Sequence, residues 1–326
     1  MIFRYFKHFA LTSTSWLLTS NDDVLVGGQA VYEGVMMRSP QGYSVAVRRQ
    51  DGSVRVIKET IKTAGEKWKI FKLPIFRGIG VLGQALVLGI KALRFSTEEA
   101  MLDVEGSTPA KEKAEESVQE SPTPQKVSPW VIGSSVVLAL GVNIGLLVAM
   151  PLFVTNLLQS RLGFESYLLF NAIDGVLRVT TFVLFLLLLS WMKDMRRVFE
   201  YHGAEHKTVY NFEARETLTI ENAKKYSTLH PRCGTSFLLV LMIVSILVFS
   251  LAHFDSFVIK LLARIVLLPL IAGISYEVIR FSAKHPRSLL RLVTYPGLLL
   301  QKITTKEPDN SQLATAIKAL EEALSV

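Results

Sequence analysis

Residues 167–192, YLLFNAIDGVLRVTTFVLFLLLLSWM, decide the fold because they form an apolar stretch long enough to cross a lipid bilayer. A helix that spans a membrane needs about 20 mostly apolar residues. Other stretches of the same kind precede and follow this one. The candidate spans are residues 130–154, 167–192, 234–254 and 257–279. We therefore expect an α-helical polytopic membrane protein with about four transmembrane helices.

The composition of the chain supports a lipid bilayer as its main partner. The 326 residues are 50% hydrophobic and carry a formal net charge of +8. The basic residues crowd the ends of the apolar stretches, which is typical of membrane proteins and argues against nucleic-acid binding. The single cysteine, Cys233, excludes an internal disulfide and suits a reducing compartment.

Lysine and arginine residues predict the orientation of these spans. Two groups flank the spans on one side: Lys193, Arg196, Arg197, Lys207, Arg215, Lys224, Lys225 and Arg232 between the second and third, and Arg280, Lys284, Arg287 and Arg291 after the fourth. The connections on the other side contain only Arg161. The positive-inside rule then predicts a multi-pass protein of the cytoplasmic (inner) membrane with both termini cytoplasmic.

The remaining segments predict a cytoplasmic α+β portion that includes an N-terminal β-hairpin. Residues 43–57 alternate β-branched and polar residues around Asp51-Gly52, which is a strong hairpin signal. We expect this β unit to be water-exposed. The uncharged stretch 78–90 is about 20 Å long as a helix, so we expect an interfacial or re-entrant segment. Near the C-terminus, an apolar stripe after Asp309 predicts an amphipathic helix.

The predicted organisation has seven parts. They are an interfacial N-terminal helix (1–23), the β unit with the amphipathic or re-entrant segment (24–95), a disordered acidic linker (96–129), transmembrane helices 1 and 2 (130–192), a cytoplasmic loop with a metal site (193–233), transmembrane helices 3 and 4 (234–280), and a cytoplasmic C-terminal segment with the amphipathic helix (281–326).

The candidate chemistry lies just after the second span, in His202-Gly203-Ala204-Glu205-His206. Residues four apart share a helix face, so both imidazoles can bind one metal ion. Glu205 could then act as a catalytic general base. The order H-x-x-E-H matches the signature of the inverzincin metallopeptidases, although so short a pattern also arises by chance.

Three further residues are candidate ligands for zinc or another divalent metal. His230 and Cys233 lie in the same loop, and Glu277 lies at the cytoplasmic end of the fourth span. In one arrangement, His202, His206 and either Glu277 or His230 bind the metal. This metal would keep an open coordination position and would suit a metal-dependent hydrolase. A metal held by the histidines, His230 and Cys233 would be closed and structural, as in a membrane scaffold or assembly factor. The alternative without a metal has these residues bonding to backbone and headgroups.

Charged residues inside the spans suggest a third, weaker function, that of a transporter. Asp174 and Arg178 lie in the second span, and Lys260 and Arg264 lie at a matching depth in the fourth. Such residues are costly in a membrane and are often functional. We expect an Asp174–Arg264 pair that acts as a structural lock between helices, since no internal repeat supports transport. Glu33, in a glycine-rich stretch, is a further candidate ligand or base.

Five blocks of the sequence together resemble one known family. They are GGQAVYEGVMMR (27–38), YHGAEHK (201–207), LHPRCGTSFLL (229–239), PLIAGISYE (269–277) and PGLLLQKITTKEP (296–308). Their order is similar to that of the YqhQ-like family of bacterial membrane proteins. One departure is Asp174, where the family leads us to expect glutamate. The resemblance implies a protein of unknown function with only a loose label as a metal-dependent enzyme, and it supplies no established catalytic residues.

Overall fold

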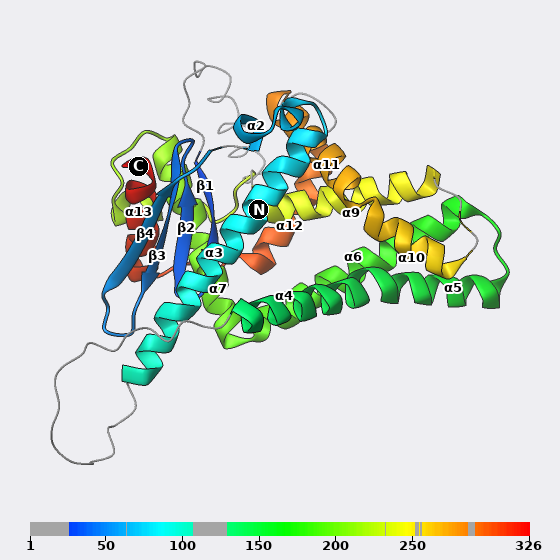
Figure 1. Cartoon of the computed structure of the whole chain (residues 1–326), viewed down its shortest axis with the longest axis horizontal. Coiled ribbons are helices and arrows are strands. Elements are labelled where there is room, and N and C mark those ends of the chain that lie inside the picture. Colours follow the sequence, from blue (N-terminus) through cyan, green and yellow to red (C-terminus); the bar gives the residue numbers. More distant parts are fainter. Residues whose placement is uncertain are drawn as a thin grey trace, which may run out of the picture.

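The computed structural model describes residues 26–62, 64–106, 129–231, 233–251, 254, 256–285 and 291–326. A β-sheet covered by helices forms one side of the molecule, and a bundle of long apolar helices forms the other (Figure 1). The interfacial helix expected over residues 1–23 and most of the acidic linker expected over 96–129 lie outside the described residues.

The sheet contains four antiparallel strands in the order β1-β2-β3-β4. Their bounds are Gly27–Val31, Gly34–Arg38, Gly42–Arg48 and Val54–Thr60. The β3–β4 hairpin forms around Asp51-Gly52 as the sequence predicts, and Gly52 has the positive φ of 85° that this turn requires. Strands β1 and β2 were not predicted, because the two residues between them, Tyr32 and Glu33, carry no strong hairpin signal.

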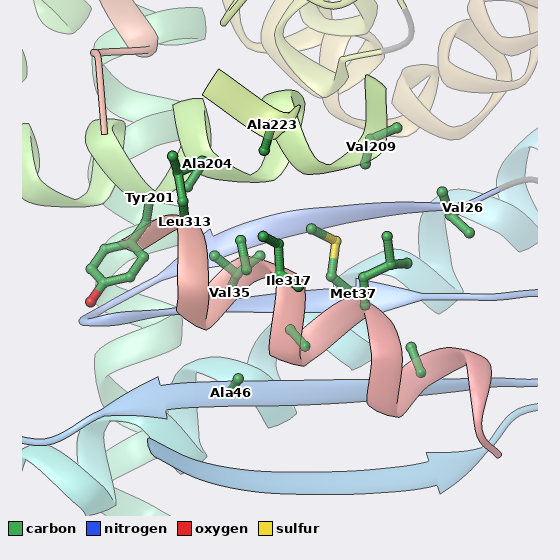
Figure 2. Close-up of a cluster of buried hydrophobic side chains, with 14 residues drawn as sticks. Val26, Val35, Met37, Ala46, Tyr201, Ala204, Val209, Ala223, Leu313 and Ile317 are labelled. Carbon is green, nitrogen blue, oxygen red and sulfur yellow. The ribbon is translucent and has the colours of Figure 1, made fainter. Parts of the chain in front are cut away.

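Helices cover both faces of the central strands β2 and β3, so only β4 of the β unit stays largely exposed. Val35 and Met37 of β2 pack against α7 (Lys193–Glu213) and α13 (Asn310–Leu324) (Figure 2). Met36 and the alternate residues of β3 face α3 (Phe76–Gly106). Burial of both sides of an alternating strand requires apolar residues at consecutive positions, which GVMMR provides.

Helix α13 closes the sheet unit from the C-terminal end of the chain. Asp309 forms a capping box with Gln312 at its start, as expected from the start signal in the sequence. Leu313 and Leu320 of the predicted stripe are fully buried, and Leu313 and Ile317 lie in the core beside Tyr201 of α7 (Figure 2). Segments from opposite ends of the chain therefore share one hydrophobic core.

Helix α3 differs from the expected short interfacial segment. It runs without a break for 31 residues and is long and apolar enough over Phe76–Leu102 to cross a membrane. However, Leu88 and Ala92 lie in the core beneath the sheet. Residues 96–106 are helical rather than part of a linker, because Glu99 pairs with Arg49 of the sheet unit.

The bundle contains the other long apolar helices. Helix α4 continues through a π-helical turn into α5, and together they provide a 30-residue candidate span over Gly133–Leu162. The elements of this half are α4 (Pro129–Ile144), the turn η3 (Gly145–Ala149), α5 (Met150–Leu162), α6 (Tyr167–Trp191), α9 (Gly234–Leu251), α10 (Phe257–Val266), α11 (Leu268–Lys284) and α12 (Arg291–Thr304). The short helices α2 (Ala64–Lys67), η2 (Lys69–Lys72) and α8 (Ile220–Lys224) complete the described elements.

The predicted fourth span is a bent pair rather than one straight helix. Helices α10 and α11 meet at an angle of 49°, and Pro269 stands at the start of α11. Proline has no N–H to continue the helical hydrogen bonds of α10, which explains the break. The described chain therefore has four helices that could each cross a membrane, α3 included, and up to five if the bent pair counts as one span.

Candidate metal centre

Three side chains predicted as metal ligands converge where the sheet unit meets the bundle. They are His202 and His206 of α7 and Cys233, which directly precedes α9. One ligand atom from each lies within 4.8 Å of the others. His206 and Cys233 are buried, and His202 is partly buried. This cluster could hold a metal ion.

The helix that carries both histidines needs a glycine between them. A Cβ at Gly203 would lie 2.0 Å from the carbonyl oxygen of Lys306. The amide of Lys306 also donates to the carbonyl of Phe199, at 2.9 Å. Gly203 weakens the helix slightly by its conformational freedom. It also allows the segment before α13 to pack directly on α7 behind the histidines.

Hydrogen bonds orient both imidazoles toward the cysteine. Nδ1 of His202 lies 2.8 Å from the carbonyl oxygen of Thr304, and Nδ1 of His206 lies 2.5 Å from that of Thr228. A carbonyl only accepts, so each Nδ1 carries the proton and each Nε2 keeps its lone pair. Nε2 of His202 lies 3.2 Å from the sulfur of Cys233. Metal-binding histidines typically have this arrangement, in which the second nitrogen is fixed by a carbonyl.

The start of α9 and a glutamine from α12 hold Cys233 in place. The carbonyl of Cys233 accepts from Ser236 in the first turn of α9, and its sulfur accepts weakly from the amide of Thr235 at 3.5 Å. Gln301 of α12 is fully buried and bonds to both the amide and the carbonyl of His230, at 2.7 and 2.8 Å. The loop that delivers the cysteine is therefore fixed to the bundle.

His230 lies beside the cluster but is not part of it. Its ring centre is 5.6 Å from that of His206, and its Nε2 lies 3.4 Å from a carboxylate oxygen of Glu213. Its ring also meets Tyr210 edge-on. Burial lowers the pKa of His230 to about 4 and also lowers the pKa of His206. Both imidazoles are therefore neutral at physiological pH, which is the form that binds metals.

Glu205 is buried between the histidine face of α7 and the sheet. One carboxylate oxygen accepts the amide of Gly28 in β1, at 3.0 Å, and the other has no hydrogen-bond partner. Burial raises the pKa of this carboxyl group, and the hydrogen bond from the amide of Gly28 opposes that shift. A buried carboxyl with a free oxygen can take up and release a proton.

The structure does not bring Glu277 or Glu33 to the cluster. Glu277 of α11 forms a bidentate ion pair with Arg77 of α3 and accepts the amide of Ile75. Glu33 forms two hydrogen bonds with Arg197 at the β1–β2 turn. Both carboxylates are neutralised by arginines that sequence spacing could not assign to them.

Sequence reasoning missed the groups that position the ligands. Two of them, at Thr228 and Thr304, are backbone carbonyls, which leave no signature in the residue type. Gln301 and Gly28 lie in blocks that were singled out, PGLLLQKITTKEP and GGQAVYEGVMMR, but without a role. The position of Gln301 directly after the apolar run Leu298-Leu299-Leu300 was the signal that could have found it.

The comparisons with known proteins agree with the resemblance of the five blocks. The profile of a family described as "Protein of unknown function (DUF1385)" matches residues 73–326. The chain is 34% identical over 302 residues to "Uncharacterized protein YqhQ" of Bacillus subtilis (strain 168), which covers 91% of this chain and 92% of the relative. No solved structure matches the chain. The chain therefore belongs to the DUF1385 family of proteins of unknown function, and the resemblance of its five blocks to the YqhQ-like family is confirmed.

Proposed function

We propose that His202, His206 and Cys233 hold a zinc ion and that the protein is a membrane-bound, metal-dependent hydrolase. The observation that carries this proposal is the orientation of the two histidines, whose Nδ1–H groups are bound to carbonyls. Two imidazoles and one thiolate favour zinc among the common divalent metals. A zinc ion at this position would polarise a water molecule or a substrate carbonyl.

The number of ligands favours a catalytic rather than a structural centre. Three protein ligands with an open fourth position are typical of catalytic zinc, whereas structural zinc has four. Within the described residues, no fourth His, Cys, Asp or Glu joins the cluster. Glu205 would serve as general base, since one of its oxygens is fixed by Gly28 and the other is available.

A structural metal in a membrane scaffold is the second candidate. It is favoured by the position of the cluster, which joins α7 of the sheet unit to the start of α9 in the bundle. In that case His230 would turn from Glu213 to complete four ligands. The two candidates therefore differ in one respect that can be measured, which is whether a small molecule can reach the metal.

We propose that this centre lies at the cytoplasmic surface of the inner membrane, which the distribution of lysine and arginine supports. Because α3 packs its second half against the sheet, we propose that it lies on that surface rather than crossing the bilayer. The two-helix connection between α6 and α9 and the basic C-terminal segment would then share the cytoplasmic side with both termini.

Cobalt substitution tests the open position directly. Co²⁺ replaces zinc in such sites and its visible spectrum reports the ligands. We expect the wild-type protein to bind one Co²⁺ with a thiolate charge-transfer band. We expect its spectrum to change when azide is added, because azide fills the fourth position. A spectrum that does not respond to azide would favour the structural candidate, and the absence of cobalt binding would exclude both.

Matched variants assign the ligands in the same assay. Cys233→Ser should lose the charge-transfer band, whereas His230→Gln should leave the spectrum and the azide response unchanged. Glu205→Gln should keep the metal, since the amide oxygen can still accept from Gly28. A shifted spectrum and a new response to azide in His230→Gln would show that His230 is a fourth ligand that closes the site.

A further inference from the structure

A second group of buried charges lies at the other end of α6, far along the bundle from the metal centre. Asp174 and Arg178 of α6 meet Lys260 and Arg264 of α10. Each of these residues is less than 9% exposed. The expected Asp174–Arg264 pair is confirmed, with 3.0 Å between carboxylate and guanidinium.

The hydrogen bonds around Asp174 leave the group with excess positive charge. One oxygen of Asp174 accepts from both Arg178, at 2.8 Å, and Arg264, at 3.0 Å. In the part of the chain that the structure describes, no other carboxylate bonds to either arginine, and their other partners are neutral. Two guanidinium groups and one carboxylate give Arg178, Arg264 and Asp174 a formal charge of +1.

Both guanidinium groups also keep an unused donor. Nε of Arg178 and Nε of Arg264 are buried and have no hydrogen-bond partner. Both groups lie over the ring of Phe249, at 5.5 and 4.9 Å from its centre, which stabilises the cations but accepts no N–H bond from Nε. Buried donors of charged groups without a partner are strongly unfavourable. An anion next to Arg264 would add a counter-charge to this group.

A pocket opens beside these cations and gives an anion a place to bind. Its lining combines Lys260, Arg264 and Asn171 with the aromatic side chains of Phe170, Phe249 and Phe254. The amino group of Lys260 lies 4.2 Å from the centre of the Phe170 ring. The pocket lies between the N-terminal part of α6 and the length of α10, and Phe249 of α9 completes its lining.

The depth of the pocket suits a group at the surface of the bilayer. Asp174 is seven residues from the start of α6 at Tyr167, which corresponds to about 10 Å along the helix. The headgroup layer on each side of the hydrocarbon core is about 5–8 Å thick. A headgroup that moves slightly inward would therefore reach Lys260 and Arg264.

We propose that this pocket binds the phosphate group of an anionic molecule, either a phospholipid headgroup or a free phosphate. Arginine forks and lysine ammonium groups together are the usual partners of phosphate oxygens. The aromatic part of the lining would hold the organic portion of a lipid. This site is independent of the metal centre, and its loss should leave the metal content unchanged.

Two probes distinguish the sources of the phosphate. The full-length protein in a neutral detergent is titrated with inorganic phosphate at constant ionic strength, and its thermal unfolding is recorded. In parallel, native mass spectrometry measures retention of phosphatidylglycerol against phosphatidylcholine, whose choline neutralises its phosphate. Preferential retention of phosphatidylglycerol without an effect of inorganic phosphate identifies a lipid site. Stabilisation by inorganic phosphate identifies a site for free phosphate.

Two variants and one control test the residues. Arg264→Gln removes the excess cation but leaves Arg178 paired with Asp174, and Lys260→Met removes the cation in the pocket. Each should weaken binding of the effective probe about tenfold, the effect of losing one charged hydrogen bond. Arg161→Gln removes an exposed cation in the last turn of α5 and should have no effect. Equal binding in the wild type and both pocket variants, or no binding of either probe by the wild type, would overturn the proposal.

Discussion

Replacing Gly203 by alanine tests how tightly the metal centre depends on packing behind α7. In an exposed helix this change stabilises by about 1 kcal/mol, because alanine loses less backbone entropy. Here the new Cβ would lie 2.0 Å from the carbonyl oxygen of Lys306. A carbonyl of the backbone cannot rotate away, so the segment must move by about 1 Å, and such overpacking costs about 1–3 kcal/mol.

The same movement would disturb the metal centre. The carbonyl of Thr304, two residues before Lys306, holds Nδ1 of His202. Losing that hydrogen bond removes about 1 kcal/mol more. The sum of these contributions predicts that Gly203→Ala lowers the free energy of unfolding by about 1–3 kcal/mol and weakens metal binding.

Chemical unfolding in detergent and metal titration of the same samples measure both effects. Gly83→Ala in α3 is the matched control, because nothing lies within 4 Å of its Cβ position. It should be neutral or stabilising by up to about 1 kcal/mol. If Gly203→Ala stabilised the protein as much as Gly83→Ala and kept its metal affinity, the packing argument would be refuted.

Three further substitutions give outcomes of different kinds. Asp174→Asn leaves two buried arginines without a counter-charge and should destabilise by about 3–5 kcal/mol in thermal unfolding, whereas a change under 1 kcal/mol would show that another anion already neutralises them. Gln301→Met removes both bonds to the backbone of His230 and should cost about 2 kcal/mol and weaken metal binding, unless the loop holds itself. The ion pair with Lys58 lowers the pKa of Glu322 to about 2. The stabilisation by this ion pair should therefore be present above pH 4.5 and disappear as the pH falls toward 2. Glu322→Gln should lower the stability only at the higher pH, and a difference that persists at pH 2 would contradict the ion pair.

Local sequence patterns predicted the elements that are stabilised mainly by contacts between residues close in sequence. The long apolar helices, the hairpin at Asp51-Gly52 and the capped C-terminal helix all follow from periodicity and turn chemistry. The pairing of β1 with β2 did not, because a two-residue turn with Glu33 at a φ of 51° has no strong sequence signal. Helix α3 extends through residue 106 and contacts the sheet. The charged and polar sequence of this segment gives no sign of those contacts.

Helical spacing was enough to predict that the two histidines of the candidate site lie together. The histidines share a face of α7, and Cys233 joins them through the fold of the intervening loop. Glu277 was selected because it lies at a similar membrane depth, but depth does not specify the direction of a side chain, and Arg77 binds it instead. The carbonyls that orient the histidines could be found only from coordinates.

X-ray absorption spectroscopy at the zinc edge of the purified wild-type protein, prepared without chelator, tests the metal centre most directly. We expect stoichiometric zinc with one sulfur at about 2.3 Å, two imidazole nitrogens at about 2.0–2.1 Å and one further oxygen ligand. Three imidazoles with one sulfur would mean that His230 closes a structural site. Protein without stoichiometric zinc, or zinc without a sulfur ligand, would contradict the centre formed by His202, His206 and Cys233.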